Sequence, residues 1–390
     1  MTAATRSDPR GNAGIAASLW QALTDGRPNG KSVYHRPRPL SGPRISLPWT
    51  GLDLLDDPHG ASPMERLACW LTTVCGITRF EPHDMLGPHH VTPTMRGVRV
   101  VTATVTDASG WRGAYDPTTH QLVGLSHQEA PPSSIAEPVR LHLDANLARV
   151  PEGYGPVRHL VGLLEAGMHL TTAVLATQAL GASADMRQPA LRSAKDPWSK
   201  ALLDVTWPGN GSSSVASTPA PSPALPDGCT LADVCRARSA GHGPWGTAPA
   251  AASAAQREAA AAAISRAKHR VSTTGAPAGL HVIDVDCGEL ARFFTYRPDV
   301  VDVAGACAAA VWTCRRSDRE ADAEAAVLAC GAQFMALALE ASAAGLTARP
   351  ARSIDATALH ARLGLRADEV IVATAILAVD SYQELSMLLA

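Results

Sequence analysis

Residues 164–182 read LEAGMHLTTAVLATQALGA, and residues 328–346 read LACGAQFMALALEASAAGL. Both stretches are rich in Ala and Leu, and both are framed by two glycines at the same spacing, Gly167 to Gly181 and Gly331 to Gly345. A long apolar stretch with a glycine after it predicts a buried helix that ends at that glycine. The sequence therefore predicts the same kind of helix once in each half of the chain.

Similar segments also precede the two predicted helices. Residues 97–117 read GVRVVTATVTDASGWRGAYDP, and residues 279–299 read GLHVIDVDCGELARFFTYRPD, so each offers an apolar strand followed by aromatic and turn residues. A duplicated unit rebuilds within one chain an interface that two subunits would otherwise share. We expect an α+β fold in which two similar domains form an intrachain pseudo-dimer around a central helix pair.

The composition is that of a globular protein. The chain has 390 residues, of which 46% are hydrophobic and 18% are charged, and its formal net charge is -2. This length favours two domains, and the small net charge gives no reason to expect binding to nucleic acid or to an anionic membrane. The first residues lack an apolar signal core, and no window has the roughly 20 uninterrupted apolar residues of a membrane span. We expect a soluble, cytoplasmic protein.

The cysteine pattern favours free thiols over zinc ligands or disulfides. None of the eight cysteines belongs to a C-x-x-C pair, and most lie inside apolar stretches. Cysteine in such a setting behaves as a small hydrophobic residue. The cysteines are Cys69, Cys75, Cys229, Cys235, Cys287, Cys307, Cys314 and Cys330.

Composition also divides the chain. Residues 208–228 are rich in Pro and Ser without an apolar period, which predicts a flexible linker. The predicted parts are then a mobile lead (1–30), a first domain (31–207), the linker and a second domain (229–390). Within them the patterns predict helices at 63–75, 157–180, 229–241, 249–269 and 320–344, strands at 98–105, 139–143, 282–285 and 370–379, extended chain at 36–48, and an element of open type at 304–314.

Two arginines at the end of one predicted helix suggest an anion site. Arg236 and Arg238 are two positions apart, so on a regular helix they diverge by roughly 200°. Both can reach one anion only if the helix ends between them, which the small residues that follow allow. Paired guanidiniums suit a phosphate because their hydrogen bonds are charge-assisted and bidentate. The alternative is an ordinary solvated helix end whose cations complement the helix dipole.

This order of parts resembles the FMN-dependent nitroreductase fold, and within it the SagB-type dehydrogenases of ribosomal-peptide modification. The resemblance covers about residues 30–200 in degenerate form and 228–380 more clearly. It implies that Arg236-Ala237-Arg238-Ser239 is similar to the element that holds the FMN phosphate and ribityl chain. It also implies that His269 to Pro277 (HRVSTTGAP) corresponds to an Arg-x-x-Pro-Ser-Ala-Gly-Ala element, which makes Thr273, Thr274 and Gly275 cofactor-binding candidates.

Further signals fit the same resemblance. GAYDP at 113–117, followed by HQL at 120–122, is similar to a SagB-type G-x-Y-x-Y-D-P-x-x-H-x-L signature, and the helix ending at Gly345-Leu346 is similar to the subunit-interface helix of the family. Arg349 and Arg352, just after it, would add positive charge near the phosphate. The alternatives are a plain turn for residues 273–275 and surface loop positions for the last two arginines.

The chain also departs from the family pattern. No basic residue follows the last predicted strand in Ala378-Val379-Asp380-Ser381, and the first half has only Arg36 and Arg38, in Pro-rich sequence, in place of an Arg-x-Arg-Ser element. The Lys-Tyr pair of azoline-oxidising members is absent, so no catalytic residue is assigned. The resemblance therefore implies one FMN per chain or none.

The resemblance implies an FMN-dependent oxidoreductase that acts on a peptide substrate, with azoline to azole oxidation as the expected reaction. Partner proteins of a modification complex, and a further homodimer of the pseudo-dimeric chain, are compatible with it. The alternatives are a flavin-free pseudoenzyme that serves as a scaffold or peptide-binding partner, and a stand-alone nitro- or quinone reductase. His83, His89 and His90 do not have the spacing of metal ligands and predict a polar loop.

Overall fold

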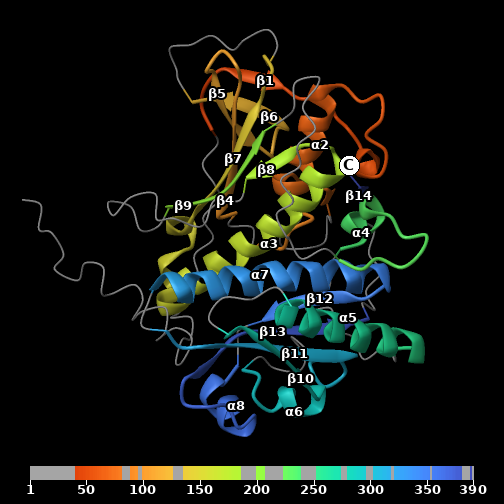
Figure 1. Cartoon of the computed structure of the whole chain (residues 1–390), viewed down its shortest axis with the longest axis vertical. Helices are drawn as coiled ribbons and strands as arrows, with labels where there is room; N and C mark the ends of the chain where they lie inside the picture. Colours follow the sequence, from red (N-terminus) through yellow and green to blue (C-terminus); the bar gives the residue numbers. More distant parts are fainter. Residues whose placement is uncertain are drawn as a thin grey trace, which may run out of the picture.

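The computed structural model describes residues 40–80, 88–94, 99–125, 135–185, 199–206, 223–238, 252–273, 279–295, 302–317, 320–351, 354–379 and 387–388. These residues form an α+β fold of two halves, with the helices α3 (Arg158–Ala179) and α7 (Glu320–Ala343) between the two larger β-sheets (Figure 1). One hydrophobic core runs through both halves, from Trp70 to Trp312. The expected fold class is therefore observed.

The N-terminal half is built on a seven-stranded sheet with the order β1-β6-β5-β4-β7-β9-β8, in which every pair is antiparallel. The helices α2 and α3 contact each other and strands of this sheet. The strands are β1 (Arg44–Ser46), β4 (Val101–Thr106), β5 (Arg112–Asp116), β6 (Gln121–Gly124), β7 (Arg140–Asn146), β8 (Ser183–Asp185) and β9 (Ser199–Thr206), and the helices before α3 are η1 (Leu52–Leu55), α2 (Pro63–Cys75), η2 (Leu147–Arg149) and η3 (Glu152–Val157).

The C-terminal half has a four-stranded antiparallel sheet with the order β10-β11-β13-β12. The helices α5 and α7 contact each other and strands of this sheet, and a second, smaller core lies beneath α6 and α8. The elements are α4 (Leu231–Ala237), α5 (Ala254–Thr273), β10 (His281–Val285), α6 (Cys287–Ala291), β11 (Ala308–Arg315), β12 (Thr347–Ala351), α8 (Ala356–Arg362) and β13 (Glu369–Ala378).

The two halves meet where α3 crosses α7. An added Cβ at Gly167 would lie 2.1 Å from the carbonyl oxygen of Leu328, and one at Gly331 would lie 2.2 Å from that of Leu164. Both distances are too short for a real Cβ, so only glycine lets the two backbones approach this closely. The contact is reciprocal, because each helix places its glycine against the leucine carbonyl of the other.

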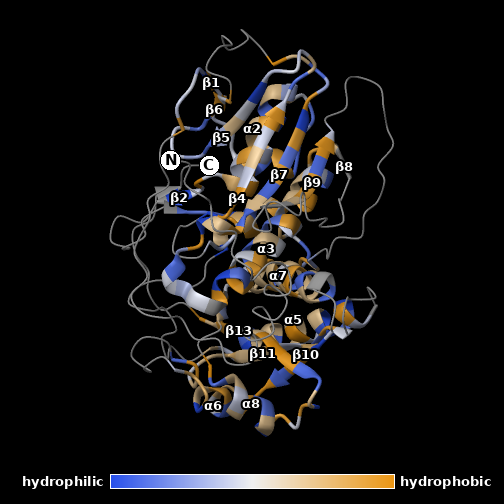
Figure 2. Cartoon of the chain, turned by 90° about the vertical axis from the view of Figure 1, so that its left-hand side faces the viewer, coloured by the Kyte–Doolittle hydropathy of each residue, from blue (hydrophilic) through white to orange (hydrophobic). Residues whose placement is uncertain are grey.

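Polar groups fix the register of this crossing. The Thr171 hydroxyl donates to the Ala332 carbonyl across 3.0 Å, and His159 Nε2 lies 3.1 Å from Glu324 Oε1, with both side chains of that pair buried. Figure 2 shows many hydrophobic residues on α3 and α7 in the middle of the molecule. Windows of α3 and α7 are apolar and long enough to span a membrane, but 89% of each window is buried inside the fold. Both are therefore core helices of the structure.

The helix α2 begins and ends as its sequence predicts. Ser62 is the N-cap, its hydroxyl accepts from the Glu65 amide, and the Glu65 carboxylate accepts from the Ser62 amide. This capping box satisfies two backbone donors that a helix start otherwise leaves unpaired. Gly76 closes the helix with a hydrogen bond to the Thr72 carbonyl. In the middle, Trp70 Nε1 donates to Thr177 of α3 across 2.9 Å, which holds the two helices together.

A small third sheet connects the end of the chain to the N-terminal half. Its order is β14 (Met387–Leu388), β2 (Arg79–Phe80) and β3 (Pro88–His89), and all pairs are antiparallel. Figure 1 shows β14 beside the N-terminal half. The last described residues of the chain thus add a strand to a segment from its first quarter.

Several predicted segments need comment. Most of the element of open type, 304–314, is the strand β11, which begins at Ala308 and ends at Arg315. At the end of the predicted flexible linker, the Ala224 amide donates to the buried Glu340 carboxylate across 2.9 Å, so this part lies against α7. The lead 1–30 and most of the linker lie outside the described residues, and the domain boundaries stay predictions. All eight cysteines are free, and all are buried or half-buried, as predicted.

We predict that Gly167→Ala and Gly331→Ala each destabilise the protein, by about 1–3 kcal/mol, because the added methyl group meets a backbone carbonyl that cannot move alone. Gly162→Ala is the matched control in α3, since its methyl group would meet the flexible end of the Leu147 side chain at 2.8 Å. Urea unfolding measures the free energy of unfolding of each variant. Equal effects of the three substitutions would contradict this account of the crossing.

Candidate functional site

The helix α4 carries the two arginines that the sequence singles out. Thr230 is its N-cap and accepts from the Asp233 amide across 3.1 Å. The helix ends at Ala237, and Arg238 has left helical geometry with ψ at 119°. The helix therefore ends between Arg236 and Arg238. This is the condition under which both arginines can reach one anion.

Residues of the N-terminal half hold α4 at both ends. Asp56 Oδ1 accepts from the amides of Leu231 and Ala232, at 3.0 and 3.3 Å, and so caps the first turn. At the other end, Arg79 Nη1 donates to the Arg236 carbonyl across 3.2 Å. A carboxylate at a helix N-terminus and a cation at its C-terminus both complement the helix dipole. The position of the two arginines therefore depends on the other half of the chain.

Arg236 is paired with two carboxylates. Its Nη2 lies 2.7 Å from Asp53 Oδ1 in η1, and its Nη1 lies 3.8 Å from Asp233 Oδ1 on its own helix. The Arg236 side chain is 21% exposed, whereas that of Asp53 is 82% exposed. The charge of Arg236 is thus compensated within the described structure.

Arg238 is placed differently. It is buried, and its Nη2 donates to the carbonyl oxygen of His90. Arg99, Arg238 and His169 all lie close enough to lower the pKa of His90 electrostatically. Arg99 itself has a positive φ of 54° and a buried Nε with no hydrogen-bond partner among the described residues. Arg99 of the N-terminal half and Arg238 of the C-terminal half thus both lie close to His90.

His90 was predicted to lie in a polar loop, and the structure corrects this. It is buried, and its Nδ1 donates to the Gly76 carbonyl at 2.5 Å. Burial, supported by Arg99, lowers the pKa of His90 to about 3, although the Gly76 hydrogen bond opposes this shift. The ring is therefore neutral at ordinary pH, with Nε2 as a hydrogen-bond acceptor. Nε2 has no partner in the part of the chain that the structure describes.

These residues fit a flavin mononucleotide in part. A phosphate dianion needs fixed cationic donors, which the buried Arg238 supplies, and a ribityl hydroxyl could donate to the neutral Nε2 of His90. Thr273 is the last residue of α5, and Arg349 lies in β12 opposite Ile376, so neither shares an element with α4. Ser239, Thr274, Gly275 and Arg352 lie outside the described residues.

Sequence reasoning missed five residues of this site: Asp53, Asp56, Arg79, His90 and Arg99. Asp53 and Asp56 belong to the DLLDD segment, whose only local signal is a short helical turn. Their role depends on partners in α4, far away in the sequence. The sequence shows a histidine at position 90, but no periodic pattern of hydrophobic residues indicates that this side chain is buried.

Tyr115 and His120, in the segment 113–122, hold part of the N-terminal half together. The Tyr115 hydroxyl lies 3.0 Å from His120 Nδ1, and His120 Nε2 lies 2.9 Å from the Pro48 carbonyl. Burial raises the pKa of Tyr115 well above its ordinary value, which makes it a poor general base. Trp49 stacks on His120 with ring centroids 4.4 Å apart and is itself 69% exposed. An indole ring is thus held in place at the surface.

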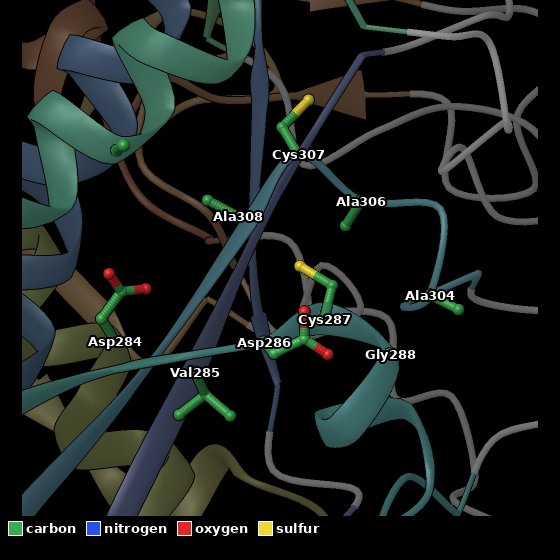
Figure 3. Close-up of a pocket in the computed structure, with 10 residues that line it drawn as sticks. Asp284, Val285, Asp286, Cys287, Gly288, Ala304, Ala306, Cys307 and Ala308 are labelled. Atoms are coloured by element: carbon green, nitrogen blue, oxygen red, sulfur yellow. The ribbon is translucent and has the colours of Figure 1, made fainter.

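A pocket of about 530 Å³ lies elsewhere, at the edge strand β10 and the start of α6. Figure 3 shows Asp284, Asp286, Cys287 and Cys307 among its lining residues. The pocket has two carboxylates and no basic lining residue among those described, so its potential disfavours a phosphate. Asp284 lies in β10, which is an edge strand of its sheet, whereas Asp286 is the N-cap of α6.

Comparison with known proteins establishes the fold. The structure matches a protein assigned as a nitroreductase from Anabaena variabilis ATCC 29413 with a TM-score of 0.64 and 12% sequence identity, covering 94% of this chain and 99% of that chain. This likeness shows that the chain has a nitroreductase-like fold, and it shows no more than the fold. No protein-family model matches the chain. No curated protein sequence matches it significantly.

Other solved structures match one part of the chain only. One, assigned as a nitroreductase from Ralstonia eutropha JMP134, has 20% identity and a TM-score of 0.29, covering 46% of this chain and 92% of its own. Another, described in complex with FMN from Exiguobacterium sibiricum 255-15, has 12% identity and a TM-score of 0.31, covering 42% of this chain and 95% of its own. TM-scores this low do not add to the assignment of the fold.

We predict that acid destabilises the protein through its buried histidines. Burial lowers the pKa of His90 to about 3 and that of His169 to about 4, both from an ordinary value of 6.5. Below pH 6.5 the unfolded chain binds protons that the folded chain does not. The free energy of unfolding therefore decreases as the pH is lowered, by about 1.4 kcal/mol per pH unit for each histidine. Urea unfolding of wild type and His169→Gln between pH 7 and pH 5 measures this loss. A pH dependence as steep in the variant as in the wild type would contradict it.

Proposed function

We propose that this protein is an FMN-dependent oxidoreductase whose flavin lies at the junction between α4 and the N-terminal half. The observation that carries the proposal is the buried Arg238, which donates to the His90 carbonyl. Arg99 lies near the same histidine, whose Nε2 has no hydrogen-bond partner among the described residues. The nitroreductase-like fold supports an oxidoreductase in general. The catalytic residue stays unassigned.

In this proposal each residue has a distinct part. Arg238 holds the phosphate, with Arg99 adding positive charge, and His90 accepts a hydrogen bond from the ribityl chain. Ser239, Thr273, Thr274, Gly275, Arg349 and Arg352 are further proposed contacts, from the resemblance alone. When bound, FMN supplies a hydride acceptor. The two halves of the chain together orient the cofactor, because Asp56 and Arg79 fix the helix that carries the arginines.

For the substrate we propose a ribosomally made peptide that contains azoline rings, each oxidised to an azole. This step removes two hydrogens from the ring, one as hydride to the flavin and one as a proton to solvent or to a base that is not assigned. The exposed ring of Trp49, close in sequence to Asp53, is a feature that a ring-bearing peptide could contact. A cytoplasmic location and partner proteins of a modification complex belong to the same proposal.

A second candidate is a flavin-free pseudoenzyme that serves as a scaffold or peptide-binding partner. One observation favours it: Arg236 is already neutralised by Asp53 and Asp233. In that case the contacts of α4 serve only to join the two halves. Flavin binding separates the two candidates.

We predict that the purified protein binds FMN and then absorbs light at about 450 nm. We also predict that Arg238→Lys weakens FMN binding by about tenfold or more, because a lysine loses the bidentate contact but keeps the charge. Arg366→Lys is the matched control, since Arg366 pairs with Asp368 at the surface far from α4 in sequence. Circular dichroism verifies that each variant is folded. Flavin binding by Arg238→Lys equal to wild type would place the phosphate elsewhere, and no binding by wild type would favour the scaffold.

We also predict that the FMN-loaded protein removes two hydrogens per ring, a mass loss of about 2 Da, from an azoline-bearing peptide. Mass spectrometry after incubation measures this loss, and the same peptide with azole rings is the control. Loaded protein that leaves the azolines intact, with oxygen and candidate partner proteins present, would contradict the substrate proposal while leaving the flavin proposal standing.

A further inference from the structure

We propose that Asp53 is an internal competitor of the flavin phosphate for Arg236, and so sets the affinity of the protein for FMN. This inference rests on the proposed function, because it assumes that the phosphate lies near the end of α4. It assigns to Arg236 two alternative partners. One is a carboxylate of the same chain and the other is the phosphate.

The side chains of Asp53 and Arg236 differ strongly in their exposure to solvent. The Asp53 carboxylate is 82% exposed and lies 2.7 Å from Arg236 Nη2, whereas the Arg236 side chain is only 21% exposed. The arginine is thus anchored in the structure, and its partner reaches it from the solvent side. Ion pairs with an exposed carboxylate contribute little to stability, because water solvates the carboxylate equally well when it leaves.

The helix α4 stays in place without the ion pair between Arg236 and Asp53. Asp56 caps the first turn of α4 through two amides, Arg79 holds the Arg236 carbonyl, and Arg238 donates to the His90 carbonyl. The backbone of η1 is fixed by its own hydrogen bonds, which the Asp53 carbonyl accepts from the amides of Asp56 and Asp57. Asp53 can therefore release Arg236 without moving either element.

The phosphate carries more negative charge than the Asp53 carboxylate with which it would compete. A phosphate monoester carries close to two negative charges at neutral pH, and the Asp53 carboxylate carries one. A dianion near Arg238 would attract Arg236 more strongly and would repel Asp53. Asp233, at 3.8 Å on the same helix, is more distant and remains beside Arg236 in either arrangement. Binding of the phosphate thus replaces one partner of Arg236 and must overcome the contact with Asp53.

The test measures FMN affinity without relying on activity. Asp53→Asn keeps the shape of the side chain and removes its charge, so we expect it to bind FMN about twofold to tenfold more tightly than wild type. Asp57→Asn is the matched control, because Asp57 is an exposed carboxylate of the same segment that accepts from the His59 amide and does not pair with Arg236. Quenching of flavin fluorescence on titration gives the dissociation constants.

Three further measurements show where the effect of Asp53→Asn acts. Riboflavin lacks the phosphate, so Asp53→Asn is expected to leave riboflavin affinity unchanged. In an Arg236→Gln background, FMN binding is expected to be weaker, and Asp53→Asn is expected to add no gain. The melting temperature of flavin-free Asp53→Asn is expected to stay close to wild type.

The outcomes separate this inference from the proposed function. If wild type binds FMN but Asp53→Asn binds it no more tightly, the competition is wrong and the flavin proposal stands. A gain that persists with riboflavin, or in the Arg236→Gln background, also overturns the competition, because it would not act through Arg236 and the phosphate. If no variant binds FMN, the proposed function fails, and this inference fails with it.

Discussion

The approach of two backbones at the crossing of α3 and α7 is the constraint on which the rest of the structure depends. Gly167 faces the Leu328 carbonyl and Gly331 faces the Leu164 carbonyl, at distances that exclude any side chain. Helices this close leave room only for small neighbours, which accounts for the many alanines on both. With the helix pair in the middle, each half of the chain completes its core against the other, and one hydrophobic core includes residues of both.

The same arrangement makes the candidate site a product of both halves. Arg236 and Arg238 come from the C-terminal half, while Asp53, Asp56, Arg79 and His90 come from the N-terminal half. The C-terminal half cannot hold α4 in place alone, because residues of the N-terminal half bind both ends of that helix. The N-terminal half thus has a clear physical part in the candidate site, because its residues hold the helix that carries the arginines.

The features that the sequence could predict are those with local causes. The bounds of α2, the glycine at its end and the two glycine-framed helices all follow from neighbouring residues. The site could be predicted only in part, because Asp53 and His90 acquire their roles from partners more than a hundred residues away. Burial of a histidine beside two arginines is a tertiary effect, and a sequence pattern has no local sign of it. Strand β11 was ambiguous for a related reason, since an apolar segment fits a buried helix or a buried strand equally well.

The pairing of β14 with β2 has a consequence for the order in which the fold assembles. Met387 and Leu388 pair with Phe80 and Arg79, which lie in the first quarter of the sequence. A contact between segments so far apart in sequence closes a long loop, and loop closure costs conformational entropy that grows with loop length. Contacts of this kind form slowly. The small sheet is therefore expected to form late in folding, after α3 and α7 have brought the two halves together.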